Sequence, residues 1–209
     1  DGSLWAMGYN ESGELGDGST TDRHSPVQVL ASGVRAIAAG FNHSLVLKDD
    51  GSLWAMGLNN LGQLGDGTNT DRHTPTQVLA SGVRAISGGD FHSLVLKDDG
   101  SLWAMGYNAY GQLGDGTTTH SNTPVQIQAS GARAIAGGGL HSLFIADDII
   151  PLITVAATTQ AAEPDTDGLF TLTRASSLVN YPLTVNLTIT GNATPGSDYV
   201  AIPATATFA

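Results

Sequence analysis

Three histidines, each followed directly by a serine, are the residues whose types and spacing first suggest chemistry. They are His43, His92 and His141, and they are separated by 49 residues. Histidine can ligate a metal ion or act as a base that activates a serine hydroxyl. Neighbouring residues of a strand point to opposite faces of the sheet, so a histidine cannot activate the serine that follows it. We therefore predict no enzymatic activity and a structural role for the histidines, with a ring nitrogen bonded to a turn carbonyl.

Two further segments carry partial binding motifs. Residues Gly62–Gly67 resemble a phosphate-binding loop, but the following helix and the Lys-Ser/Thr pair of such loops are missing. The segment recurs at Gly13–Gly18 and Gly111–Gly116, and this repetition favours turns at positive φ over a ligand site. Asp165-Thr166-Asp167-Gly168 begins like an EF-hand loop, but it lacks flanking helices and a distal glutamate.

The chain is acidic and has no cysteine. Its 209 residues include 8 Lys and Arg and 19 Asp and Glu, which gives a net charge of −11. Nucleic acids and anionic membranes attract clustered cations, whereas these cations are scattered, so neither partner is expected. The lack of cysteine excludes disulfides and thiolate metal sites, and no apolar run reaches the ~18 residues of a membrane span. The chain begins at Asp1, which we interpret as a start within a longer protein.

An internal repeat of 49 residues organises the first part of the chain. The motif Asp-Gly-Ser-Leu-Trp-Ala-Met-Gly occurs three times, and its tryptophans are Trp5, Trp54 and Trp103. A unit of this size cannot bury both faces by itself and must stack on its neighbours, so we predict that these tryptophans are core residues. Each unit is predicted to contain four short strands with an Asp-Gly hairpin turn between the second and third. In the first complete unit the strands are expected at residues 34–38, 43–48, 52–56 and 75–79.

Four motifs of the repeat together resemble the regulator of chromosome condensation family over residues 1 to about 148. They are Gly-x-x-His-Ser-Leu-x-Leu, Asp-Gly-Ser-Leu-Trp-Ala-Met-Gly, Asn-x-x-Gly-Gln-Leu-Gly-Asp-Gly and Pro-x-Gln-Val. The resemblance implies a β-propeller, usually of seven blades. Residues 34–79 and 83–127 are whole units, and residues 1–29 and 133–146 are partial ones. About three blade-equivalents cannot close a ring of 4–8 blades, so we predict an open arc whose missing blades lie upstream.

The period breaks after residue 148, and residues 149–209 are predicted to be a second domain. Alternation in residues 168–174 and 183–189 indicates strands and favours a truncated β-sandwich, so the whole chain is expected to be all-β. The segment resembles the N-terminal part of a Calx-beta domain over about residues 152–209. Its motifs are Gly168-x-Phe-Thr-x-Thr-Arg, Pro-Leu-Thr-Val and Gly-Asn-Ala-Thr-x-Gly-Ser-Asp-Tyr199.

The Calx-beta resemblance implies a calcium site. Glu163 and Asp198 match acidic positions of that family's site, and Asp165 and Asp167 lie close by. Calcium takes six to eight oxygen ligands, and the family's later acidic cluster lies beyond the end of this chain. The alternative is an acidic loop that is simply solvated.

Three functional hypotheses remain open. The first is a binding or display module of a larger exported or cell-surface protein, with calcium held by the second domain. The second is guanine-nucleotide exchange or another regulatory function of a propeller, and the third is an accessory region that docks on an enzyme or acts as a spacer. A protein or glycan partner is expected at the blade loops, where residues Asn69–His73 and Thr117–Asn122 vary most.

Overall fold

Paired strands make up the regular structure throughout the computed structural model, which describes residues 2–147, 153–159, 169–174, 183–186 and 205–208. The chain divides into two compact units, Asp1–Asp148 and Ile149–Ala209. All the regular elements in the described ranges are β-strands, and every pairing between them is antiparallel. The all-β prediction is therefore confirmed.

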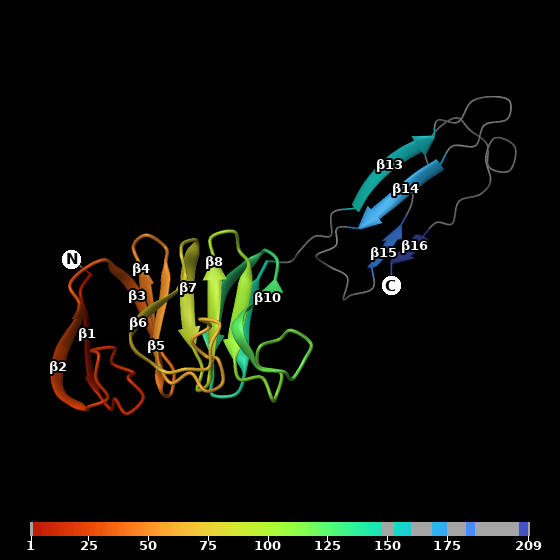
Figure 1. The fold of residues 1–209 in the computed structure, drawn as a ribbon. Helices are drawn as coiled ribbons and strands as arrows, with labels where there is room; N and C mark the ends of the chain where they lie inside the picture. The colour runs from red at the N-terminus through yellow and green to blue at the C-terminus, as the bar shows by residue number, and fades with distance from the viewer. Residues whose placement is uncertain (1, 148–152, 160–168, 175–182, 187–204, 209) are drawn as a thin grey trace, which may run out of the picture. The chain divides into compact units, whose positions relative to one another are not determined.

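Two complete four-stranded blades form the centre of the first unit (Figure 1). The sheet order in the first blade is β3-β4-β5-β6 and in the second β10-β9-β8-β7. The strands of the first blade are β3 Val34–Ala39, β4 His43–Lys48, β5 Leu53–Gly57 and β6 Arg72–Leu79. Those of the second are β7 Val83–Gly88, β8 His92–Lys97, β9 Leu102–Gly106 and β10 Ser121–Gln128.

A half-blade lies at each end of this unit (Figure 1). The strand pair β1 (Leu4–Gly8) and β2 (Arg23–Leu30) corresponds to the third and fourth strands of a blade. The pair β11 (Ala132–Gly137) and β12 (Ser142–Ala146) corresponds to the first and second strands. Residues 2–147 therefore form about three blade-equivalents of an open propeller, as the repeat predicts.

The second unit contains two described strand pairs. Strand β13 (Ile153–Thr159) pairs with β14 (Leu169–Arg174), and β15 (Leu183–Asn186) pairs with β16 (Thr205–Phe208). The candidate calcium residues Glu163, Asp165, Asp167 and Asp198 lie outside the described residues.

Local sequence explains the two features that shape each blade. The predicted hairpin turn forms where Gly51 adopts a φ of 77° and the Lys48 amide donates to the Ser52 carbonyl at 3.0 Å, because a residue without Cβ takes this conformation at no steric cost. The outer strand β6 begins at Arg72, three residues before the predicted start. Pro75 lies inside it, beside a register shift, which a strand at the edge of a sheet tolerates.

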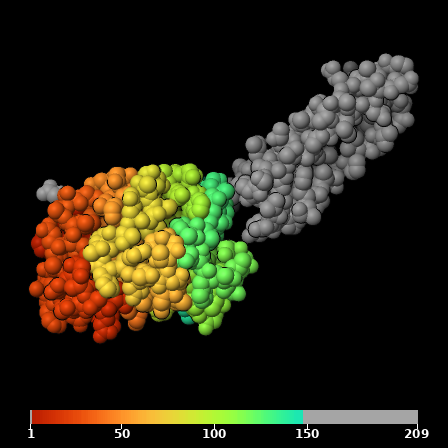
Figure 2. Space-filling view, viewed as in Figure 1, coloured from red at the N-terminus to blue at the C-terminus, as the bar shows by residue number. Residues whose placement is uncertain are grey.

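The hydrophobic core is shared between blades. Leu45, Leu47 and Leu53 of the first blade form one buried cluster with Val95 and Met105 of the second. Strand β4 contacts β7, and β8 contacts β11. Figure 2 shows the successive blades side by side in chain order. Because one face of each blade is buried only by the next blade, stacking is what excludes water from the core.

The structure corrects the prediction that the motif tryptophans are core residues. Trp54 and Trp103 are half-buried, and Trp5 is 53% exposed. The indole nitrogen of Trp54 donates to Ser52 Oγ at 2.8 Å, and Lys48 Nζ lies 3.9 Å from the centre of its ring. Tryptophan has a polar nitrogen and a ring that attracts cations, so it suits a position at the edge of the core. In the two complete blades, the leucine before the tryptophan and the alanine and methionine after it are buried.

Candidate interaction surface

Two of the three repeated histidines join successive blades, whereas His141 is exposed and its ring makes no hydrogen bond within the described residues. His43 Nε2 lies 2.9 Å from Ser93 Oγ of the next blade, and His92 Nε2 lies 2.8 Å from Ser142 Oγ. The partner is therefore a serine of the following blade, and the predicted turn carbonyl is not the acceptor. The equal 49-residue spacing allows this contact, because units that stack in register bring the histidine of one strand opposite the serine of its copy, but the spacing alone does not give that register.

The hydrogen bonds of Ser93 determine which group donates in this contact. The hydroxyl of Ser93 donates to the Gln63 carbonyl at 2.7 Å, so its own proton is used there. His43 must therefore donate from Nε2, and its Nδ1 carries a lone pair that has no partner among the described residues. The resulting chain runs from His43 through Ser93 to Gln63, and its serine is fully buried. This serine holds blades together and is closed to substrates.

Burial keeps these histidines neutral. Burial lowers the pKa of His43 from 6.5 to about 4, and the neighbouring His92 makes a smaller contribution in the same direction. Burial also lowers the pKa of His92, against the opposing charge of Asp90. A protonated ring would place a charge where Nδ1 has no acceptor, which is costly in a water-free site.

A buried asparagine organises each long loop between the third and fourth strands. Asn59 Nδ2 donates at 3.1 Å to the carbonyls of Thr68 and Thr70, and Asn59 Oδ1 accepts from the Leu64 amide at 3.0 Å. Asn10 and Asn108 make the corresponding bonds in their own loops.

The glycines of the same loops adopt turn geometry. Gly62, Gly65 and Gly67 all have positive φ, at 80°, 75° and 83°. The turn prediction for this motif is therefore confirmed. Its repeated residues are accounted for by the loop's own hydrogen bonds.

The loop of the second blade departs from the pattern. In the first blade, Asp66 pairs with Arg72 at 2.6 Å, and Asp71 accepts from the Asn59 amide. In the second, His120 Nδ1 accepts from the corresponding Asn108 amide at 3.0 Å, and a serine replaces the arginine. The predicted variable stretch Thr117–Asn122 therefore differs in side chains and hydrogen bonds from the corresponding loop of the first blade.

Differences between repeats gather at one end of the blades. The turn end, residues 48–52 and 97–101, is identical in the two complete blades. The opposite end, here called the loop end, contains the long loops that lie together in Figure 1 and the short turns before β4, β8 and β12. There one repeat position holds Phe41, Asp90 and Gly139 in successive units.

Aromatic side chains, exposed at the two ends of the series and half-buried between them, form a row along the loop end. The ring centres of Phe41 and Phe91 are 6.0 Å apart, those of Phe91 and Tyr107 6.4 Å, and those of Tyr107 and Tyr110 6.1 Å. Phe41 and Tyr110, at the two ends of this aromatic row, are each 70% exposed. Aromatic residues concentrate where proteins bind one another.

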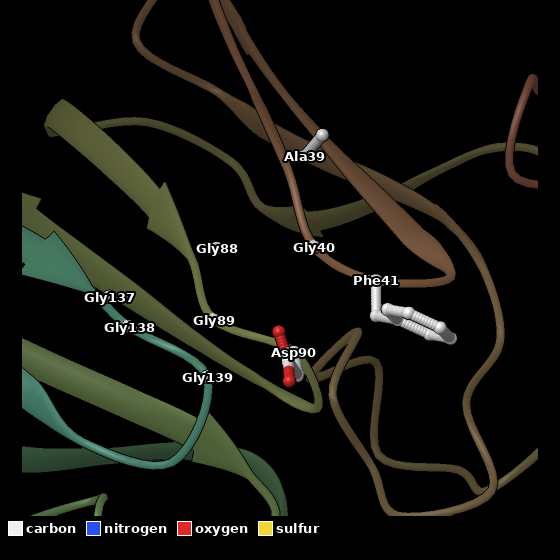
Figure 3. A pocket seen from close by; sticks show the side chains of 9 residues that line it. All are labelled: Ala39, Gly40, Phe41, Gly88, Gly89, Asp90, Gly137, Gly138 and Gly139. Carbon is white, nitrogen blue, oxygen red and sulfur yellow. The ribbon is translucent and has the colours of Figure 1, made fainter.

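A hollow of about 350 Å³ lies beside this row (Figure 3). We call it the glycine hollow, because six of its nine lining residues are glycines. It is lined by Ala39, Gly40, Phe41, Gly88, Gly89, Asp90, Gly137, Gly138 and Gly139. Figure 3 shows side chains only from Ala39, Phe41 and Asp90, so most of the wall is backbone.

No metal site was found in the described part of the chain. Within it, no group of three or more His, Cys, Asp or Glu side chains could hold an ion. The same residues contain no helix long and apolar enough to cross a membrane.

Blades of four antiparallel strands that stack through a shared core define this molecule as a β-propeller-type repeat protein. The chain belongs to the regulator of chromosome condensation (RCC1) repeat family, whose model matches residues 1–47, 50–96 and 99–145. A second model of the same repeat matches residues 34–63 and 83–112. The resemblance seen in the sequence is confirmed for these residues. The matches do not extend beyond residue 145, and they lend no support to the Calx-beta resemblance.

Solved propellers share the fold. The chain is 20% identical to Prp20p from Saccharomyces cerevisiae, with a TM-score of 0.62 over 68% of this chain and 39% of that one. It is 23% identical to yeast RCC1 (Prp20) in its complex with Kap60, with a TM-score of 0.58 over 69% of this chain and 38% of that one. The chain thus spans under half the length of these relatives. No curated protein sequence matches significantly. Propellers built from this repeat mediate protein–protein interaction or regulation.

Proposed function

We propose that this chain is a non-enzymatic protein-binding module whose loop end is the binding surface. One observation carries the proposal: residues that differ between otherwise near-identical repeats gather at that end and are exposed or half-buried there. Positions needed for stacking are kept in every repeat, as the cross-blade histidines are. Variation confined to exposed loops of a rigid scaffold is typical of a surface that recognises a partner.

The solved relatives support this class of function. Prp20p is described by its binding to Gsp1p and histones, and yeast RCC1 (Prp20) was solved bound to Kap60. These partners belong to those proteins. The fold they share with this chain supports protein binding as a class, and the aromatic row supplies the kind of side chain that anchors such interfaces.

A peptide selection tests the proposal. The full chain is used to select binders from a random peptide library, and the selected peptides are then titrated against two double variants. Phe41→Ser with Tyr110→Ser should weaken binding at least about tenfold, because each exposed anchor contributes on the order of 1 kcal/mol or more. Asp49→Asn with Asp98→Asn, at the turn end, should leave affinity unchanged. Equal effects of the two variants would refute the loop end as the surface.

Export and calcium binding are finer proposals that rest on the second unit. We infer that the parent protein acts at the cell surface or outside the cell, with Glu163 and Asp198 contributing to a calcium site. Calcium titration of the full chain by calorimetry tests the site. Binding that is lost in Asp198→Asn supports it, and an unchanged titration in that variant counts against it.

A further inference from the structure

Asp90 is a carboxylate without a partner in the glycine hollow. It is half-buried, and its Oδ2 would lie 2.9 Å from a Cβ placed on Gly139. Among residues 2–147, no side-chain or backbone donor bonds this carboxylate and no cation pairs with it. Burial lowers the pKa of His92 even though the charge of Asp90 acts to raise it, so His92 does not supply the missing cation. A half-buried charge that lacks a partner is unfavourable, so this one gains from an incoming cation.

The chain's own cations are engaged elsewhere. Residues 2–147 contain thirteen Asp and Glu but only seven Lys and Arg. Three arginines pair with carboxylates, two donate to carbonyls of the next blade, and both lysines lie over tryptophan rings. The three paired arginines are Arg23, Arg72 and Arg133. The two that donate to carbonyls are Arg35 and Arg84, and the two lysines are Lys48 and Lys97. The cation for Asp90 must therefore come from outside this unit.

Close backbone packing keeps the hollow free of side chains. A Cβ on Gly88 would lie 2.6 Å from the Ala39 carbonyl oxygen, and one on Gly137 would lie 2.7 Å from the Gly88 carbonyl oxygen. Glycine is required at both positions because neighbouring inner strands touch there. Small-molecule pockets of similar size are mostly apolar, whereas this wall is polar backbone with one carboxylate.

An aromatic side chain stands at the rim. Phe41 is among the lining residues, and its ring lies 6.0 Å from that of Phe91. The face of an aromatic ring attracts cations. A guanidinium combines a planar fork that fits a carboxylate with a flat face that stacks on a ring, and an ammonium offers only a point charge. The pair Phe41 and Asp90 therefore favours arginine.

We propose that the glycine hollow receives an arginine side chain from a basic segment of a protein partner. The guanidinium pairs with Asp90 and stacks against Phe41, and the rest of the segment lies along the aromatic row. This inference rests on the proposed function, since it places the partner at the loop end. The net charge of the chain favours such a partner as well. The site occurs once in residues 2–147, because one repeat later Gly139 stands where Asp90 does.

The test is a titration followed by nuclear magnetic resonance on the ¹⁵N-labelled full chain. The probes are a nine-residue peptide with three arginines and its lysine and glutamate counterparts. The arginine peptide should shift the amide signals of Gly88, Gly89, Gly138 and Gly139 in a saturable way. The lysine peptide should bind more weakly, and the glutamate peptide should not bind.

A matched pair of variants separates the site from general charge attraction. Asp90→Asn keeps the shape of the side chain and should weaken arginine-peptide binding at least about tenfold, as expected for a charge-assisted hydrogen bond. Asp98→Asn makes the same charge change at the turn end and should change affinity less than about twofold. Equal losses, or no shifts at the four glycines, would overturn the proposal. Shifts confined to Tyr107 and Tyr110 would overturn it too, while leaving the loop end as the binding surface.

Discussion

His43 of one blade donates a hydrogen bond to Ser93 of the next, with 2.9 Å between Nε2 and Oγ. The Ser93 hydroxyl donates in turn to the Gln63 carbonyl, so three residues from two blades form one directed chain of hydrogen bonds. His92 and Ser142 repeat the contact at the next junction. The stacking of blades is thus held by buried polar bonds as well as by the shared apolar core.

Removing Ser93 should weaken the junction. Ser93→Ala leaves the His43 donor and the Gln63 carbonyl without partners in a buried site, which typically costs about 1–3 kcal/mol. Ser44→Ala is the matched control, because Ser44 donates only to the Glu14 carbonyl and no described histidine bonds it. Urea unfolding followed by tryptophan fluorescence measures the difference, since Trp5, Trp54 and Trp103 all lie in the first unit. Equal losses in the two variants would contradict this role.

Stability should depend on pH between about 6.5 and 4. The pKa of His43 is lower in the folded chain, about 4, than its value of 6.5 in the unfolded chain, so the unfolded state takes up the proton first. The stabilisation is complete above pH 6.5 and falls as the pH drops toward 4. Protonation linked to His43 alone should lower the free energy of unfolding by roughly 2 kcal/mol between pH 7.5 and 5.0, since each unit of pKa difference is worth about 1.4 kcal/mol.

Urea midpoints at pH 7.5 and 5.0 measure this loss. The window lies above the range in which Asp17 titrates, because hydrogen bonds from Ser19 and then Arg23 lower its pKa to about 2. His43→Gln removes one titrating group and should make the profile shallower, leaving the smaller dependence that comes from His92, whose pKa is also lowered by burial. A wild-type midpoint that does not move between the two pH values would contradict a neutral, buried His43.

Changing the loop asparagine should open its loop. In Asn59→Asp a carboxylate would face the carbonyls of Thr68 and Thr70, where Asn59 now donates, and the expected cost is about 2–4 kcal/mol. Asn60→Asp, at an exposed position of the same loop whose side chain makes no hydrogen bond within the described residues, is the control. Limited proteolysis at Arg72 should become faster only in the first variant. Faster cleavage in both would show that the buried amide is not what holds the loop.

The repeat made much of the fold predictable. Identical spacing of motifs located the strands, and the glycine of the Asp-Gly turn located the hairpin between β4 and β5. The start of β6 was missed, because the pattern of side chains does not record the main-chain pairing of Arg72 with Gly57 across a bulge.

Contacts between blades are harder to predict from the sequence. Periodicity within a strand predicts which face a residue occupies, but it does not show which residue of the next blade it meets. Hence the sequence predicts neither the bond from His43 to Ser93 nor the half-buried position of Trp54 at the edge of the core. The glycine hollow arises where Gly88 and Gly137 let inner strands approach, and such an approach has no signature within a single repeat.

Making the repeats alike at the loop end tests the central claim most directly. The double variant Phe41→Gly with Asp90→Gly gives these two positions the residue found at Gly139. The loop-end account predicts a free energy of unfolding, measured in urea, within about 0.5 kcal/mol of the wild type, as for surface changes, together with loss of binding to peptides selected against the unmodified chain. Full binding by the folded double variant would show that the partner is recognised elsewhere.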